Sequence, residues 1–292
     1  MTKKHLLILW AVVAVGVSGV ILSAAGTNGT VVSTNSLPAD EKSVIDDLNG
    51  IVVRINAKLE QGKKTAADLA DNLKEFDALY ARHRGEPIKA VVQILLAKLN
   101  LYGQVLDDPE RAVTVLKQIQ QDYPGIQING NTDELIESLQ KEAEARKIQS
   151  LLVVGAPFPN FEEKDLGGKP LSVAGYKGKV VLIDFWATWC PLCVAELPDV
   201  LATYKKYHSQ GFEVVGISLD EDRPQLEKFV KARGLAWPQY NDGLFWKTKL
   251  ALKYGIQKLP STYLLDRNGT IIGKDLFGDD LSQAVAKALA SK

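Results

Sequence analysis

Residues 180–198 read Val-Val-Leu-Ile-Asp-Phe-Trp-Ala-Thr-Trp-Cys-Pro-Leu-Cys-Val-Ala-Glu-Leu-Pro. The stretch opens with an apolar run rich in β-branched residues, which predicts a strand buried on both faces. It ends as a predicted helix. Cys190 and Cys193 stand where the strand gives way to the helix, and they are the only two cysteines among 292 residues.

The position of the two cysteines favours thiol chemistry. If the helix begins at Cys190, its sulfur lies beside unpaired backbone N–H groups at the positive end of the helix dipole. A thiolate, the reactive form of cysteine, is favoured there. Cys193 lies one turn further on the same face, close enough to form a disulfide with Cys190. We therefore expect the pair to alternate between dithiol and disulfide.

Two other uses of a cysteine pair are disfavoured. A zinc site needs two further ligands, but there is no other cysteine, and the three histidines, His5, His83 and His208, are scattered. A purely structural disulfide across two intervening residues restricts the unfolded chain only slightly. We expect no metal and no cofactor.

The segment 184–193 matches the thioredoxin pattern Asp-Phe-Trp-Ala-x-Trp-Cys-x-x-Cys at each fixed position. Residues from about 155 to 292 resemble the TlpA/ResA-like branch of the thioredoxin superfamily, which is related to the AhpC/TSA redoxins. The resemblance implies an extracytoplasmic thiol–disulfide oxidoreductase. It also implies an α/β thioredoxin-like fold, in which helices flank a central mixed sheet and a β-hairpin precedes it.

The resemblance implies roles for residues outside the cysteine pair. Pro260 matches the proline that follows a cis peptide bond and faces the redox pair in this superfamily. The backbone of Leu259 would then be free to pair with an extended substrate. Trp189 and Pro191, beside the nucleophile, complete the expected substrate-binding surface.

In thiol–disulfide exchange, Cys193 must lose its proton before it can attack Cys190. Two carboxyl groups are candidates to accept that proton. Asp184, six residues before Cys190, matches the buried acid of thioredoxins, and Glu196, three residues after Cys193, matches an acid of the ResA-like branch. Burial in an apolar strand raises the pKa of a carboxyl group, which then suits proton transfer near neutrality. The alternatives are a backbone-bonded Asp184 at the strand end and a solvated Glu196 on the helix face.

Strand and helix patterns alternate through the rest of this domain, which predicts a sheet that is parallel at its centre. Pro198 lies inside the helix that follows the cysteines, where it is expected to produce a kink. Further elements are predicted as a hairpin over 161–173, strands over 211–220, 235–240, 261–266 and 270–275, and helices over 224–233, 245–253 and 281–289.

Residues 38–150 show helical periodicity and predict an all-α domain of helical hairpins. The expected helices cover 44–59, 65–80, 87–102, 109–122 and 132–149. Thr65 with Asp68 and Asp108 with Pro109 are their clearest start signals. The apolar stripes indicate a core rather than a ligand groove. Spacing, dimerisation and holding a client protein all remain open as the role of this domain.

The N-terminus predicts export from the cytoplasm. Lys3 and Lys4 precede an uncharged run over 6–22, and no charge follows until Asp40. Residues 1–25 are therefore expected to form a signal peptide or a membrane anchor, and residues 26–37, which are small and polar, a flexible linker. The domain division is then 1–25, 26–37, 38–150 and 155–292, in a protein of the periplasm or cell envelope that is anchored or secreted.

The predicted function is reduction of protein disulfides through Cys190-Pro191-Leu192-Cys193. Its expected partners are disulfide-containing client proteins and a membrane electron donor. The 35 basic and 35 acidic residues balance, so no general attraction to nucleic acid is expected. A peroxiredoxin-type thiol peroxidase is one alternative, although Thr188 lies only two residues before Cys190 and no suitable proline precedes it. A non-catalytic adaptor that uses the helical domain is the other.

Overall fold

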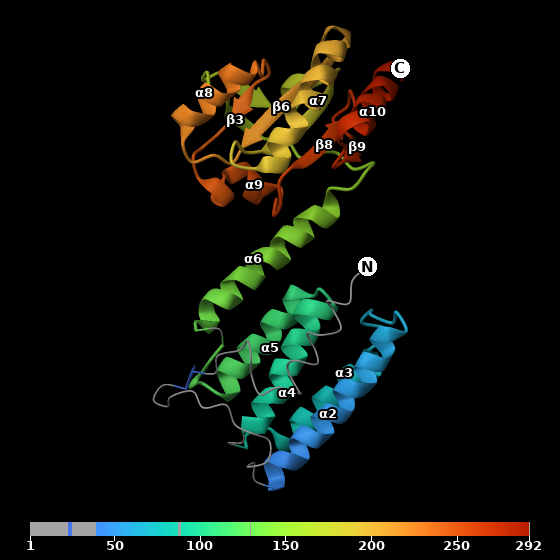
Figure 1. The fold of residues 1–292 in the computed structure, drawn as a ribbon, viewed down its shortest axis with the longest axis vertical. Helices are drawn as coiled ribbons and strands as arrows, with labels where there is room; N and C mark the ends of the chain where they lie inside the picture. The colour runs from blue at the N-terminus through green and yellow to red at the C-terminus, as the bar shows by residue number, and fades with distance from the viewer. Residues whose placement is uncertain (1–22, 25–38, 87–88, 129, 292) are drawn as a thin grey trace. The chain divides into compact units, whose positions relative to one another are not determined.

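The computed structural model describes residues 23–24, 39–86, 89–128 and 130–291 (Figure 1). The predicted linker and most of the predicted signal or anchor lie outside these residues. Within the described part of the chain, no helix is long and apolar enough to cross a membrane. The chain divides into two compact units, residues 1–143 and 144–292, and the division falls inside a helix. The domain limits given above remain a sequence prediction.

The first unit is helical, as predicted. Its helices α2, α3, α4 and α5 share one apolar core, with α4 contacting the other three. The bounds are α2 (Ala39–Glu60), α3 (Ala70–His83), α4 (Lys89–Asn100), the π-helical turn η2 (Leu101–Val105), α5 (Pro109–Asp122) and α6 (Thr132–Leu151). A two-residue strand, β2 (Ile126–Gln127), pairs with β1 (Ser23–Ala24). The π-helical turn was not predicted, and the predicted helix start at Pro87 lies outside the described residues.

The two predicted helix starts behave differently. Asp108 caps α5, since its carboxylate accepts a hydrogen bond from the N–H of Arg111 at 3.0 Å. Thr65 and Asp68 also bond to each other: the Thr65 hydroxyl donates to the Asp68 carboxylate at 2.7 Å, and the Asp68 N–H donates back at 3.2 Å. Residues 66–69 nevertheless form turns, so the regular helix α3 begins only at Ala70.

The second unit contains a mixed sheet, as predicted, and its five strands lie in the order β7-β6-β5-β8-β9. Its central strand β5 (Val180–Trp186) pairs parallel with β6 (Phe212–Ser218) and antiparallel with β8 (Ser261–Leu265). At the edges, β7 (Gln239–Tyr240) is parallel to β6, and β9 (Ile271–Lys274) is antiparallel to β8. All residues of β5, β6 and β8 are buried, which explains their nearly continuous apolar sequence.

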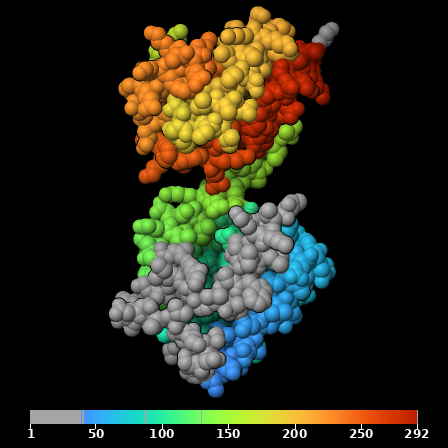
Figure 2. Space-filling view, viewed as in Figure 1, coloured from blue at the N-terminus to red at the C-terminus, as the bar shows by residue number. Residues whose placement is uncertain are grey.

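Helices and a hairpin complete the second unit. The helices are α7 (Pro191–Tyr207), α8 (Arg223–Arg233), α9 (Lys249–Lys253) and α10 (Gly278–Ala290). Figure 2 shows the yellow side chains of α7 beside the red ones of α10, which it contacts. The predicted hairpin is present as β3 (Glu162–Lys164) and β4 (Pro170–Ser172), joined through Gly168 in the left-handed region.

Two predicted elements of this unit are shorter than expected. The strand over 235–240 is reduced to the two residues of β7. The helix over 245–253 is broken into the 3-10 turn η5 (Phe245–Lys247) and α9, because Thr248 has extended backbone angles of −46° and 126°. The last helix, in contrast, begins at Gly278, earlier than predicted.

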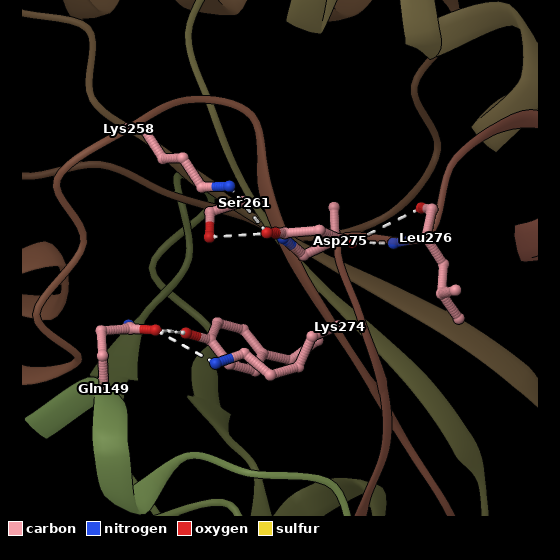
Figure 3. A network of polar contacts seen from close by, with 8 residues as sticks. Gln149, Lys258, Ser261, Lys274, Asp275 and Leu276 are labelled. Carbon is pink, nitrogen blue, oxygen red and sulfur yellow. Dashed lines mark hydrogen bonds and ion pairs between the residues drawn. The ribbon is translucent and has the colours of Figure 1, made fainter. Parts of the chain in front are cut away.

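The C-terminal end of α6 packs within the second unit. Ile148 contributes to its apolar core, and the side-chain amide of Gln149 donates to the carbonyl of Tyr254 at 2.6 Å. Figure 3 shows Gln149 beside Lys274, whose ammonium group donates to it at 3.2 Å. The backbone of Gly255 comes so close to α6 that a Cβ atom there would lie 2.5 Å from the carbonyl oxygen of Ala145.

We predict that Gly255→Ala lowers the free energy of unfolding of the second unit by about 3 kcal/mol, because the methyl group would collide with backbone and φ is positive. Gly234→Ala is the matched control: φ is also positive, but nothing lies within 4 Å of the added atom, so about 1 kcal/mol is expected. Urea unfolding followed by tryptophan fluorescence reports on this unit. Equal losses in the two variants would contradict the close approach to α6.

Candidate active site

The cysteine pair lies at the N-terminus of α7. Cys190 is the N-cap residue, with extended backbone angles, and Pro191 occupies the first helical position. The Cys190 sulfur accepts a hydrogen bond from the N–H of Cys193 at 3.1 Å. The sequence prediction considered Cys190 as the first residue of the helix, and it lies one position earlier. A helix N-terminus favours the thiolate form of a nearby cysteine. Proline suits the first helical position because its nitrogen needs no hydrogen bond there.

Cys190 and Cys193 form a disulfide bond, with Cα atoms 5.3 Å apart. Both cysteines are buried, whereas Pro191 and Leu192 between them are exposed. The disulfide thus lies beneath an exposed first turn of α7. The described residues contain no group of three or more His, Cys, Asp or Glu side chains that could bind a metal ion.

The loop before Cys190 is held by Asp220, a residue that the sequence analysis did not select. Its carboxylate accepts hydrogen bonds from the N–H of Thr188 at 3.0 Å and from the Thr188 hydroxyl at 2.5 Å. The hydroxyl of Ser218 also donates to it, at 2.8 Å. The available sequence signal was an aspartate at the end of the predicted strand 211–220, because the carboxyl ends of parallel strands share one sheet edge.

Asp184 lies within β5, paired with Thr262 of β8 on one side and Gly216 of β6 on the other. It is only 5% exposed. Burial alone raises the pKa of its carboxyl group to about 7, since removal from water disfavours the charged form. A carboxyl group with a pKa of about 7 is suited to proton transfer at neutral pH.

We predict that Asp184→Asn changes how stability depends on pH. The folded protein holds the Asp184 proton up to about pH 7, whereas the unfolded chain loses it near pH 4. Raising the pH through this interval therefore destabilises the wild type, and asparagine does not titrate. The free energy of unfolding of the wild type should fall by on the order of 4 kcal/mol relative to the variant. Urea unfolding of both proteins in the oxidised form, repeated across this pH range, measures the free energy of unfolding. If it changed with pH in the same way in both proteins, the raised pKa of Asp184 would be contradicted.

Glu196 is placed on the first part of α7 and is half-buried. Its Oε2 atom is buried, and among the described residues nothing forms a hydrogen bond with it. The side chain is thus not a fully solvated helix-face residue, which was the alternative interpretation. A buried acceptor oxygen without a hydrogen-bond partner is uncommon in folded proteins.

The segment around Pro260 lies at the same edge of the sheet as the cysteine loop. The peptide bond between Leu259 and Pro260 is cis, as expected. The next residue, Ser261, pairs with Phe185 near the end of β5, the strand that leads to Cys190. Leu259 is partly buried against the core of the unit. The fold therefore brings the two predicted functional segments to one end of the central strand.

An apolar surface adjoins the cysteine loop. Trp189 is 43% exposed, and its ring centroid lies 5.0 Å from that of Phe245 and 6.1 Å from that of Trp246. Leu192, three residues after Trp189, and Leu244, directly before Phe245, are also well exposed. Phe245 and Trp246 were missed as site residues because the sequence placed them in a helix. Phe245 instead has a φ of 54°, and its carbonyl accepts a hydrogen bond from the Thr248 hydroxyl at 2.6 Å.

Comparison with known proteins bears on the second unit. The Redoxin family profile matches residues 153–289. The thiol-disulfide oxidoreductase ResA of Geobacillus thermodenitrificans is 33% identical over 123 residues, which is 42% of this chain and 69% of that protein. ResA of Bacillus cereus is 35% identical over 121 residues, which is 41% of this chain and 68% of that protein. The thioredoxin domain of a Bacteroides vulgatus thiol-disulfide oxidoreductase is 33% identical, covering 47% of this chain and 97% of that one, with a TM-score of 0.44.

The mixed sheet and the cysteine pair at the start of α7 define a thiol–disulfide oxidoreductase with a thioredoxin-like fold. The chain belongs to the ResA/TlpA-like branch of the thioredoxin superfamily, as the sequence motif indicated. The named relatives are thiol-disulfide oxidoreductases, so the oxidoreductase prediction is confirmed at that level.

Proposed function

We propose that this chain reduces disulfide bonds of client proteins through Cys190 and Cys193. The observation that carries the proposal is the position of the Cys190 sulfur, which caps α7 and bonds to the N–H of Cys193. That position favours a thiolate at Cys190 once the disulfide is reduced. The thiolate is the attacking form in thiol–disulfide exchange.

The reaction proceeds in two exchanges. The Cys190 thiolate attacks one sulfur of the client disulfide, forms a mixed disulfide and releases the other client sulfur as a thiolate. Cys193, after losing its proton, attacks the Cys190 sulfur, so that the second client sulfur leaves and the Cys190–Cys193 disulfide forms. The client gains two electrons and the dithiol loses two. The protons released by the cysteines are taken up by the client thiolates.

Asp184 and Glu196 are the proposed proton acceptors for Cys193. The pKa of Asp184, raised to about 7 by burial, makes it able to take a proton near neutrality. Glu196 lies three residues after Cys193 in α7, almost one turn along, and its Oε2 atom is buried. Residues one turn apart share a helix face, which places this carboxyl group on the side of the cysteine.

Client binding is assigned to the surface around the disulfide. The proposed contacts are Trp189, Pro191, Leu259 and Pro260, with the backbone of Leu259 available to an extended chain. Phe245 and Trp246 extend this surface, because both rings contact Trp189. Exposed aromatic side chains supply large contact area at low entropic cost.

We further propose that the protein works outside the cytoplasm, attached to the membrane or secreted, and that a membrane partner supplies its electrons. The support is in the sequence: two lysines precede the uncharged run over 6–22, in residues that the structure does not describe. Each turnover leaves the pair oxidised, so a separate dithiol must reduce it before the next.

The test of the function is a trapping experiment. With Cys193→Ser, the mixed disulfide at Cys190 should persist, because the group that resolves it is absent. Reduced full-length protein mixed with insulin, a disulfide-containing probe, should therefore give a covalent adduct that dithiothreitol removes. Cys190→Ser is the control and should give none. The wild type should also reduce insulin.

The reduction potential of the Cys190/Cys193 pair tests the direction of the reaction. We expect a value near that of thioredoxin, about −270 mV, whereas a value near about −120 mV would mean that the pair oxidises its clients.

Glu196→Gln tests the proposed proton acceptor. The glutamine side chain retains the shape but cannot accept the Cys193 proton, so resolution of the mixed disulfide should slow by about tenfold or more. Formation of the mixed disulfide, which depends on Cys190, should be unchanged. Rapid mixing with insulin separates the two steps. Equal rates of resolution in wild type and variant would remove Glu196 from the mechanism and leave Asp184.

A further inference from the structure

Asp275 directly follows β9 and has a φ of 48°. A positive φ is uncommon for a residue other than glycine, although aspartate tolerates it better than most. Hydrogen bonds to Thr262 fix this conformation: the Asp275 N–H donates to the Thr262 carbonyl at 2.9 Å, and the N–H of Leu276 donates to the Thr262 hydroxyl at 3.2 Å. The backbone turn thus directs the Asp275 side chain back along β8.

The carboxylate of Asp275 contacts residues on both sides of the Leu259–Pro260 bond (Figure 3). Its Oδ2 accepts from the ammonium group of Lys258 at 2.9 Å. Its Oδ1 accepts from the N–H of Thr262 at 3.2 Å and from the Ser261 hydroxyl at 3.4 Å. One side chain therefore ties together the two ends of segment 258–262.

The contacts of Asp275 with Lys258 and with Thr262 differ in strength. The Lys258 side chain is 75% exposed, so its ion pair with Asp275 is solvated and screened by salt. Thr262, in contrast, is only 3% exposed. A backbone N–H at such a position is costly to leave without an acceptor, and an ionised acceptor bonds it more strongly than a neutral one. The hydrogen bond to Thr262 is therefore the contact that holds the segment.

We propose that Asp275 is a positioning residue that holds the Leu259–Pro260 segment in the arrangement that receives the client protein. The inference rests on the function proposed above, in which this segment binds the client. Asp275 acts through its hydrogen bonds to Thr262 and Ser261. Its removal should consequently impair docking of a protein client and leave the chemistry of the cysteine pair unchanged.

Two variants separate the carboxylate from the backbone turn. Asp275→Gly adopts the positive φ freely but has no acceptor for the Thr262 N–H. Asp275→Asn also tolerates this φ and keeps a carbonyl oxygen in the Oδ1 position. Lys258→Met, which removes only the exposed ion pair, serves as the control for charge.

The experiment uses the full-length chain, with insulin as the protein probe and oxidised glutathione as the small disulfide. For Asp275→Gly we expect the KM for insulin to rise about fivefold or more, with kcat, the reduction potential and the rate with oxidised glutathione unchanged. Asp275→Asn and Lys258→Met should stay within about twofold of the wild type. If the glycine variant does not fold, Asp275→Ala takes its place with the same expectation, because its side chain also has no acceptor.

The outcomes distinguish the inference from the proposed function. If the wild type does not reduce insulin, the proposed function fails and the inference fails with it. If the wild type is active and Asp275→Gly has the same KM, only the inference is overturned. A glycine variant that loses activity equally toward insulin and oxidised glutathione, or that shifts the reduction potential, also overturns it, because Asp275 would then act on the cysteine pair rather than on docking.

Discussion

The pairing of β5 on both of its sides is the constraint on which the rest of the second unit depends. Its seven residues are all buried, and each edge is satisfied by a different neighbour, β6 in parallel and β8 in antiparallel. This register places three loops, which are distant in sequence, at one sheet edge: the cysteine loop, the end of β6 with Asp220, and the segment before β8. A slip of one residue would turn every side chain of β5 to the other face, so the site and the core share one register.

The same burial has an electrostatic consequence. Asp184 lies in the middle of the strand, where the apolar surroundings that stabilise β5 disfavour a charge and raise the pKa of its carboxyl group. A residue chosen only for stability would be apolar at this position. The fold retains a carboxyl group there at a cost to stability that grows as the pH rises from about 4 to about 7.

Local signals predicted much of the second unit, and relations between distant segments explain what they missed. Some features can be recognised from neighbouring residues alone, so the sequence was sufficient to predict them. These are the apolar run of β5, the proline at the start of α7 and the proline before β8. The sequence does not reveal the partners of Asp220 and Asp275, because these are decided by which strands become neighbours. The helix predicted over 245–253 failed for a related reason: Phe245 has a positive φ that propensity alone disfavours, and the Thr248 side chain stabilises it.

Three aspartates hold three loops in a similar way: the loop before Cys190, the segment before β8 and the segment 242–249. Asp220 binds the N–H of Thr188, Asp275 binds that of Thr262, and Asp242 accepts from the N–H groups of Leu244 at 3.2 Å and Lys249 at 2.8 Å. Because backbone N–H groups are satisfied by carboxylates, these loops do not need to bury their own side chains to stay ordered. The apolar side chains of Trp189 and Leu244 are consequently left exposed to solvent. An ordered loop with an exposed apolar face binds a partner with little further loss of conformational entropy.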